Sequence, residues 1–310
     1  MSGYYVSDLM HLNTMGVDSR SSNSSIKVVF GCIASETGNI RTAGVNGIFG
    51  FSQHSMSVIS QLSSQGVAPD SFSHCLVGSG NGGGILVFGQ IMDPNMAYTP
   101  LVHSRQVLFR PDYQVNLQSI SVNGQTLSID PSTFSYAGNQ TGTVIDSGTT
   151  MAYLPLDVLT LLKDAISQAV SQSAQPVISR EDGCYIFNSS VSSIFPLVSL
   201  NFQGGSSMHI RPQDYLLQDN SKGGAWCLGF QQSSVTQGMT ILGDLVLKDK
   251  IIVYDLGGQR LGWSDYNCSS SVNVSSTSSN AGQIGSSTSF PMLILASILQ
   301  YAFTFSTLSQ

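Results

Sequence analysis

Charged residues are scarce in this sequence, and basic residues do not cluster anywhere in it. Only 10% of the 310 residues are Asp, Glu, Lys or Arg, and the formal net charge is −6. Proteins that bind nucleic acid through its phosphates present a basic surface. The composition therefore argues against nucleic acid as a partner. The abundant Ser, Gly and Val favour short β-strands joined by small-residue turns.

Metal-binding patterns are missing as well. The five cysteines and five histidines form no CxxC pair and no Cys/His group at the spacing of metal ligands. We therefore expect no metal and no cofactor. The histidines are scattered along the chain, which argues against a catalytic histidine of the Ser-His-Asp type. They are His11, His54, His74, His103 and His209.

The first residues lack the marks of a signal peptide. The opening stretch MSGYYVSDLM has neither a basic region nor an apolar core. Other features are typical of a secreted protein, because the chain has cysteines available for disulfides and several Asn-X-Ser/Thr sequons. We therefore expect a glycoprotein of the secretory pathway whose true N-terminus lies upstream. The sequon asparagines are Asn23, Asn139, Asn188, Asn267 and Asn273.

The composition changes after Cys268. Residues 269–289 are rich in Ser and Asn and predict a disordered spacer, whereas residues 290–310 form a mostly apolar tail. The tail is short for a membrane-spanning helix and has no basic stop, and a buried core helix would be oddly tethered by the spacer. A glycosylphosphatidylinositol (GPI) attachment signal explains both segments. We place the attachment at Asn280 and expect the protein to be anchored on the extracellular face of the plasma membrane.

Between its ends the chain predicts one strand after another. Examples are YYVSDLMHL, IKVVFGC, ILVFGQ, YQVNLQSISV and MTILGDLVL. Asn123-Gly124 predicts a type I′ hairpin turn. Two helices are expected, over Ser57–Gln65 and Pro155–Val170. The apolar face of the second consists of Val158, Leu161, Leu162, Ala165, Ile166 and Ala169.

The stretch GTVIDSGTTMAYLP, residues 142–155, holds the candidate catalytic residue. Asp146 follows a short apolar strand and sits on a tight Ser-Gly turn, with hydroxyl side chains next to it in the sequence. A carboxylate in this setting is typical of one half of a two-carboxylate catalytic centre. Two other places, Ile48–Gly50 and Ile241–Gly243, set two apolar residues before a glycine.

These motifs resemble the pepsin-like aspartic proteases, and most closely their plant-type, GPI-anchored members. The segments GIFGFSQHSMSVISQL, FSHCLVG and ILGDLVLKDKIIVYDLGGQRLGW extend the resemblance over nearly all of Gly3–Cys268. It implies a mostly β, bilobal fold with an incomplete N-terminal lobe and a complete C-terminal lobe. The expected divisions are the N-terminal-lobe remnant with inter-lobe strands (1–111), the C-terminal catalytic lobe (112–268), the spacer (269–289) and the GPI-signal tail (290–310).

The resemblance also implies roles for the residues around Asp146, which matches the aspartate of the C-terminal lobe. In the active-site loop, Ser147 matches the hydroxyl that links the two loops, Gly148 completes the turn, and Thr149 matches the hydroxyl that binds the catalytic carboxylate. Residues Ile241, Leu242 and Gly243 match the family's strand that supports this loop. Residues Ile48, Phe49 and Gly50 match the equivalent strand of the N-terminal lobe. Asp244 and Asp255 are expected to be structural hydrogen-bond acceptors.

The resemblance implies two disulfides. Cys184 pairs with Cys227 inside the C-terminal lobe, and Cys75 pairs with Cys268. Cys32 is then left without a partner in this chain.

One departure from the family bears on activity. The chain has a single Asp-Ser-Gly or Asp-Thr-Gly sequence, at Asp146, whereas the family's mechanism uses two aspartates that share a proton, beneath a flap tyrosine. We therefore expect an aspartic endopeptidase acting on polypeptides whose chain, as given, is monomeric and inactive by itself. The alternatives are a non-catalytic peptide-binding surface protein and a homodimeric protease in which two Asp146 turns meet.

Overall fold

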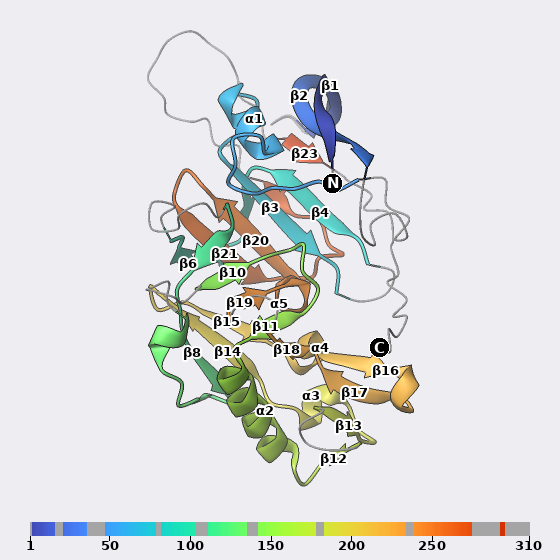
Figure 1. The fold of residues 1–310 in the computed structure, drawn as a ribbon, viewed down its shortest axis with the longest axis vertical. Helices are drawn as coiled ribbons and strands as arrows, with labels where there is room; N and C mark the ends of the chain where they lie inside the picture. Colours follow the sequence, from blue (N-terminus) through green and yellow to red (C-terminus); the bar gives the residue numbers. More distant parts are fainter. Residues whose placement is uncertain are drawn as a thin grey trace.

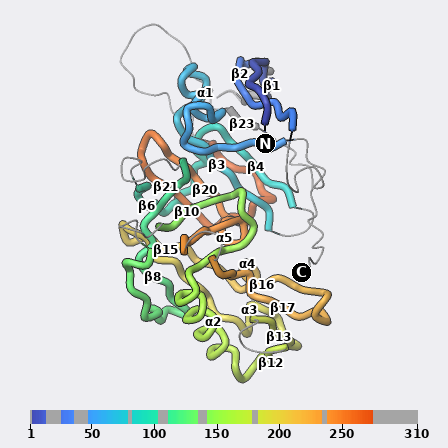
Figure 2. The backbone as a smooth tube through the Cα atoms, in the orientation of Figure 1, coloured from blue at the N-terminus to red at the C-terminus, as the bar shows by residue number. Residues whose placement is uncertain are grey.

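The computed structural model of the chain is mostly β, as the resemblance implied (Figure 1). Strands far apart in the sequence lie side by side, because β3 (Ser71–Leu76) pairs with β20 (Lys250–Asp255) (Figure 2). The residues that the structure describes are 2–15, 21–35, 47–78, 82–102, 111–134, 142–177, 183–233, 238–274 and 292–294.

A six-stranded sheet lies between the N-terminal hairpin and the helical end of the molecule (Figure 1). Its strand order is β23-β4-β3-β20-β21-β6. Apolar side chains cover both of its faces: Phe72 stacks on Tyr254 on one face, and Val253 packs in a second cluster on the other. The other strands are β4 (Gly84–Phe88), β6 (Ala97–Pro100), β21 (Arg260–Asp265) and β23 (Met292–Ile294).

The N-terminal hairpin forms a separate two-stranded sheet of β1 (Ser2–Met15) and β2 (Ser21–Ser35). The side chain of Gln61, on α1 (Val58–Ser64), binds both the N–H and the C=O of Val29 at 2.8 Å and so ties β2 to the body of the protein. The hairpin nevertheless leaves large apolar side chains in solvent on both of its faces, because neighbouring residues of a strand point to opposite sides. They are Tyr4, Tyr5, Leu9, Phe30 and Ile33.

Three sheets build the part of the molecule around residues 113–242. The five-stranded sheet β18-β11-β19-β10-β7 carries the Asp-Ser-Gly turn, and the two four-stranded sheets are β15-β14-β8-β9 and β12-β13-β17-β16. Their strands are β7 (Tyr113–Val115), β8 (Leu117–Val122), β9 (Gln125–Thr126), β10 (Thr143–Ile145), β11 (Ala152–Leu154), β12 (Gln175–Pro176), β13 (Cys184–Ile186), β14 (Val198–Phe202), β15 (Ser207–Ile210), β16 (Leu216–Asp219), β17 (Ala225–Leu228), β18 (Phe230–Gln232) and β19 (Thr240–Leu242).

The local signals for one turn and two helices are confirmed. Asn123 and Gly124 join β8 to β9 with φ of 47° and 79°, the positive values that a type I′ turn requires. Helix α1 is followed by Gly66 at φ 69°, and α2 (Leu156–Val170) begins after Pro155. The shorter helices are α3 (Val191–Ile194), α4 (Pro212–Tyr215) and α5 (Asp244–Leu247), with 3₁₀ turns η1 (Pro131–Phe134) and η2 (Asn220–Lys222).

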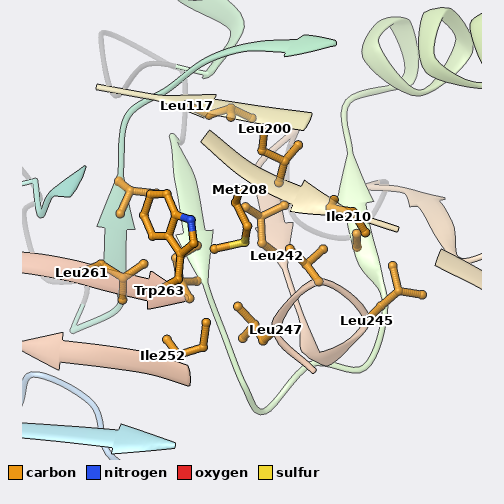
Figure 3. Close-up of a cluster of buried hydrophobic side chains, with 14 of the residues drawn as sticks. Leu117, Leu200, Met208, Ile210, Leu242, Leu245, Leu247, Ile252, Leu261 and Trp263 are labelled. Carbon is orange, nitrogen blue, oxygen red and sulfur yellow. The ribbon is translucent and has the colours of Figure 1, made fainter. Parts of the chain in front are cut away.

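Two expectations about these elements were wrong. Helix α2 buries Leu159 and Val170, whereas Leu161 and Ala169 are exposed, because the sheets cover a face rotated from the one the apolar spacing suggested. The stretch MTILGDLVL is not one strand, since β19 ends at Leu242 and α5 follows. Residues from both elements enter the main core, where Leu242, Leu245 and Leu247 lie near Met208 and Ile252 (Figure 3).

The structure contains the two disulfides that the resemblance implied. Cys184 and Cys227 face each other across β13 and β17. Cys75 of β3 is joined to Cys268, 193 residues away along the chain. A bond that closes so long a loop stabilises the fold by about 3–5 kcal/mol, chiefly by restricting the unfolded chain. Cys32 has a free thiol.

The segment expected to be a disordered spacer begins with ordered structure. Asn273 and Val274 form β22 and pair with β5 (Ile91–Met92), so this part of the expectation was wrong. β23, which lies within the expected GPI-signal tail, is also a strand, because its backbone pairs with β4. Asn280 lies outside the described residues. Among those described, no helix is long and apolar enough to cross a membrane.

His74 lies at the centre of the six-stranded sheet and is fully buried. Neither ring nitrogen has a hydrogen-bond partner among the described residues. Burial lowers the pKa of His74 from its ordinary 6.5 to about 4. Because the unfolded chain takes up this proton at a higher pH than the folded chain does, the neutral ring contributes stability above about pH 6.5 that is lost as the pH falls through 4.

Candidate active site

The Asp-Ser-Gly turn starts at the end of β10, which the sequence predicts as a short apolar strand. β10 runs between β7 and β19, and the burial of Thr143, Val144 and Ile145 anchors it. The turn itself begins with the N–H of Asp146 donating to the C=O of Leu242 at 3.0 Å. The supporting strand therefore fixes the position of the aspartate backbone.

Both oxygens of the Asp146 carboxyl group accept hydrogen bonds from the turn. The N–H of Gly148 donates to Oδ1 at 2.9 Å, and the hydroxyl of Thr149 donates to Oδ2 at 2.6 Å. The N–H of Thr149 also donates to the C=O of Asp146 at 3.1 Å, which closes the turn. Two donors on one carboxylate fix its orientation and stabilise its negative charge. The resemblance implied the bond from Thr149, whereas it placed Gly148 in the loop without assigning it a bond to the carboxyl group.

The strand Ile241–Leu242 supports the turn from below, and Gly243 lets the two segments meet. β19 pairs in parallel with β10 and antiparallel with β11, so it lies between the strands that lead into and out of the turn. A Cβ atom placed on Gly243 would stand 2.2 Å from the C=O oxygen of Thr149 and 2.5 Å from that of Met151. Only a glycine allows this approach without a shift of the backbone.

Ser147 contacts a residue that the sequence reasoning did not single out. Its side chain hydrogen-bonds the hydroxyl of Tyr254, which comes from the six-stranded sheet. Burial raises the pKa of Tyr254, and the charges of nearby Tyr113, Asp146 and Asp244 raise it further. Tyr254 therefore stays a neutral hydroxyl under the turn. No local sequence pattern places it there, because 107 residues separate Tyr254 from Ser147.

The proposed N-terminal-lobe counterpart of this support is not a strand. Residues 47–50 have no regular structure, and the side chains of Ile48 and Phe49 are 73% and 54% exposed. Gly50 is exposed as well. In β19 the equivalent apolar residues are held between β10 and β11, and no such pair of strands flanks residues 48–50 within the described part of the chain. Within the described residues, Ile48, Phe49 and Gly50 therefore do not form the support that the resemblance assigned to them.

The two other aspartates that were expected to be structural behave differently from each other. Asp255 accepts hydrogen bonds from the N–H of Gly258 at 2.9 Å and from Nε of Arg260 at 2.7 Å, as expected. Asp244 opens α5, and its Oδ1 is buried without a hydrogen-bond partner among the described residues. Its pKa is raised to about 7, by burial first and then by the negative charge of Asp146. The sequence reasoning missed this second carboxyl group beside the turn.

The remaining candidate residues lie apart from the turn. Asn188, Asn267 and Asn273 are exposed, as glycosylation would require, and Asn23 lies in β2. Asn139 and His103 lie outside the described residues. His209 contacts Ser199 on a neighbouring strand and His11 contacts Ser25 on the N-terminal hairpin, so these two histidines lie at separate places. The described part of the chain contains no group of side chains suited to a metal ion.

A mostly β fold in which an apolar-apolar-Gly strand supports a hydrogen-bonded Asp-Ser-Gly turn defines a pepsin-like aspartic protease architecture. Comparison with known proteins supports this class. A model of the xylanase inhibitor C-terminal domain matches residues 112–265, and a model of the xylanase inhibitor N-terminal domain matches residues 1–90. The chain belongs to the pepsin-like aspartic protease family.

Individual relatives agree with this assignment. The chain is 35% identical over 289 residues to Aspartic proteinase 36 of Arabidopsis thaliana, which covers 91% of this chain and 58% of that protein. It is 32% identical over 305 residues to Aspartic proteinase 39 of the same plant, covering 94% of this chain and 61% of that protein. The chain therefore spans about three fifths of the length of these relatives.

A solved structure shows the same fold. The crystal structure of edgp superposes with a TM-score of 0.69 and covers 86% of this chain and 70% of its own. At 20% sequence identity, this likeness concerns the fold alone.

Proposed function

We propose that this chain supplies the C-terminal half of an aspartic endopeptidase site, with Asp146 as one of its two catalytic carboxylates. The observation that carries the proposal is the double hydrogen bond to the Asp146 carboxyl group from Gly148 and Thr149. These contacts hold the carboxyl group in one orientation at the end of a short, buried strand. Peptide hydrolysis needs one ionised carboxylate to take a proton from water and one protonated partner to polarise the scissile carbonyl.

The 310-residue chain by itself holds one such turn, so it lacks the paired carboxylates. A single aspartate cannot act as base and acid in the same step. We therefore expect a polypeptide substrate to bind without being cleaved. The exposed apolar side chains of the N-terminal hairpin, together with Ile48 and Phe49, are the surface that further polypeptide would cover.

The test is an assay of the purified 310-residue chain against a denatured protein substrate at acid pH. The expected result is no cleavage above the level of an Asp146→Asn control. Cleavage that Asp146→Asn abolishes would contradict the proposal and favour a homodimer in which two Asp146 turns meet. Cleavage that this substitution leaves unchanged would place the chemistry elsewhere in the chain.

A second candidate function is non-catalytic binding. It is favoured by the two matching family models, which are described as xylanase inhibitor domains. The same purified chain, added to a xylanase assay, distinguishes the two candidates. Stoichiometric inhibition that Asp146→Asn does not alter would support a binding protein, whereas an unchanged xylanase rate would remove this candidate.

The proposed location is the outer face of the plasma membrane, where a GPI anchor holds the protein. The proposal is supported by the exposed sequon residues Asn188, Asn267 and Asn273, by the two disulfides, and by the pattern of the last residues. We expect phosphatidylinositol-specific phospholipase C to release the protein from membranes. Asn280→Leu with its neighbours Ser279 and Ala281 also changed to Leu should prevent anchoring. Membrane retention after the phospholipase, or anchoring of the variant, would contradict the proposed location.

A further inference from the structure

Asp244 lies directly against the Asp-Ser-Gly turn. It is the first residue of α5 and follows Gly243, the glycine at which backbone segments meet. Its N–H donates to the C=O of Thr149 at 2.7 Å, and the N–H of the next residue, Leu245, donates to the C=O of Thr150 at 2.9 Å. These two backbone bonds fix the start of α5 to the loop that holds Asp146.

The surroundings of Asp244 do not stabilise a negative charge. Its buried Oδ1 accepts no hydrogen bond from the described residues. The titratable groups that face it are Asp146 on the turn, whose negative charge repels its own, and the buried hydroxyl of Tyr254 on β20. Asp244 is half-buried, and a carboxylate oxygen that is buried without a donor or a cation disfavours the charged form, so this place favours a neutral carboxylic acid.

The basic side chains of the elements packed around α5 are engaged elsewhere. Arg211, before α4, binds Asp214 at 2.9 Å, and Lys250 on β20 lies 3.7 Å from the same carboxyl group. Lys248, at the end of α5, lies near Asp214 and Asp249. These cations therefore serve a separate network and leave Asp244 without a counter-charge among the described residues.

We propose that Asp244 is a proton-holding, positioning residue for Asp146: it remains a neutral acid beside the turn, so that this half of the site carries one negative charge instead of two. The inference rests on the proposed function only in naming Asp146 as a catalytic carboxylate. In an assembled two-aspartate site, Asp244 would keep a third negative charge away from the pair that shares the catalytic proton. Asp146 and Asp244 then have different roles because their environments differ.

The direction of the Asp244 pKa agrees with this role. Burial is the largest cause of its rise to about 7, and the charge of Asp146 is the second. Asp244 is therefore neutral throughout the acid range and ionises only near neutral pH. Because the two groups interact, neutralising Asp146 should lower the pKa of Asp244 while burial keeps it above the ordinary 3.8.

The experiment follows the aspartate carboxyl carbons of the folded 310-residue chain by ¹³C NMR over a pH titration. One aspartate signal is expected to titrate with a midpoint near 7. Asp244→Asn should remove this signal. Asp70→Asn is the matched control, because the pKa of Asp70 is also raised, by partial burial and then by Asp255; this variant should keep the signal. Asp146→Asn should shift the midpoint toward lower pH.

Each outcome decides the inference without any measurement of proteolysis. A wild-type chain in which no aspartate titrates above about pH 5 would overturn it, and this result needs no variant to fold. A midpoint near 7 that survives Asp244→Asn would assign the proton to another residue. A midpoint that Asp146→Asn leaves unchanged would show that Asp244 does not sense the catalytic carboxylate.

Discussion

Asp146→Asn is expected to lower kcat on the order of 10³–10⁴-fold in an enzyme assembled from this chain and an upstream family segment that contains an Asp-Thr-Gly turn and a flap. The assembled enzyme should cleave denatured protein at acid pH. The amide of asparagine keeps the shape of the side chain and its contact with Thr149, but it neither ionises nor shares a proton with the partner carboxylate. KM should change little, because the loss concerns the chemical step. The measurement is a set of initial rates over substrate concentration.

The matched control is Asp157→Asn, an exposed aspartate in the first turn of α2. It changes net charge by the same amount and should leave the rate unaltered. An assembled enzyme that retains its kcat after Asp146→Asn would show that the hydrogen-bonded turn is not part of the catalytic centre. Circular dichroism of the Asp146→Asn variant distinguishes a loss of catalysis in a folded enzyme from a loss of activity caused by unfolding.

Gly243→Ala is expected to lower the free energy of unfolding by about 3 kcal/mol, at the upper end of the range for overpacking. The added methyl group would meet two backbone carbonyl oxygens, those of Thr149 and Met151, at 2.2 and 2.5 Å. Backbone atoms cannot move aside as the end of a flexible side chain does. Relief of the clash would separate β19 from the turn and break the bond from Asp244 N–H to Thr149. Urea unfolding followed by tryptophan fluorescence measures the change.

Gly257→Ala provides the comparison for this substitution. Gly257 is exposed in the turn between β20 and β21, and a Cβ atom there would meet nothing within 4 Å. Its effect on stability should stay within about 0.5 kcal/mol. Equal midpoints for Gly243→Ala and the wild type would mean that the turn has room that the structure does not show.

The sequence predicted those features that depend on neighbours along the chain. Asn123-Gly124 requires only the freedom of its own backbone to make a type I′ turn, and α1 ends where Gly66 allows the chain to leave the helix. The hydrogen bonds from Gly148 and Thr149 to Asp146 are also local, because the partners lie two and three positions apart in the sequence. The motif could therefore be recognised with its chemistry before its surroundings were known.

The face of α2 could not be predicted in the same way. Apolar spacing suggested Leu161 and Ala169 as buried positions, yet the structure buries Leu159 and Val170. An amphipathic pattern gives the period of a helix, whereas the direction of its buried face depends on the sheets against which it packs. Ile48 and Phe49 show the same limit, since an apolar pair becomes part of a core only where other strands cover it.

What the sequence by itself determined is the family, the Asp-Ser-Gly turn with its donors, and the two cysteine pairs that the resemblance implied. Only the tertiary structure decided the protonation of Asp244 and the contact of Ser147 with Tyr254. These two features depend on burial and on charges that reach the turn from α5 and β20, distant parts of the chain. An aspartate is written the same way in the sequence whether its side chain lies in water or in the core. The pKa of its carboxyl group can differ by several units between these two environments, because burial disfavours the charged form.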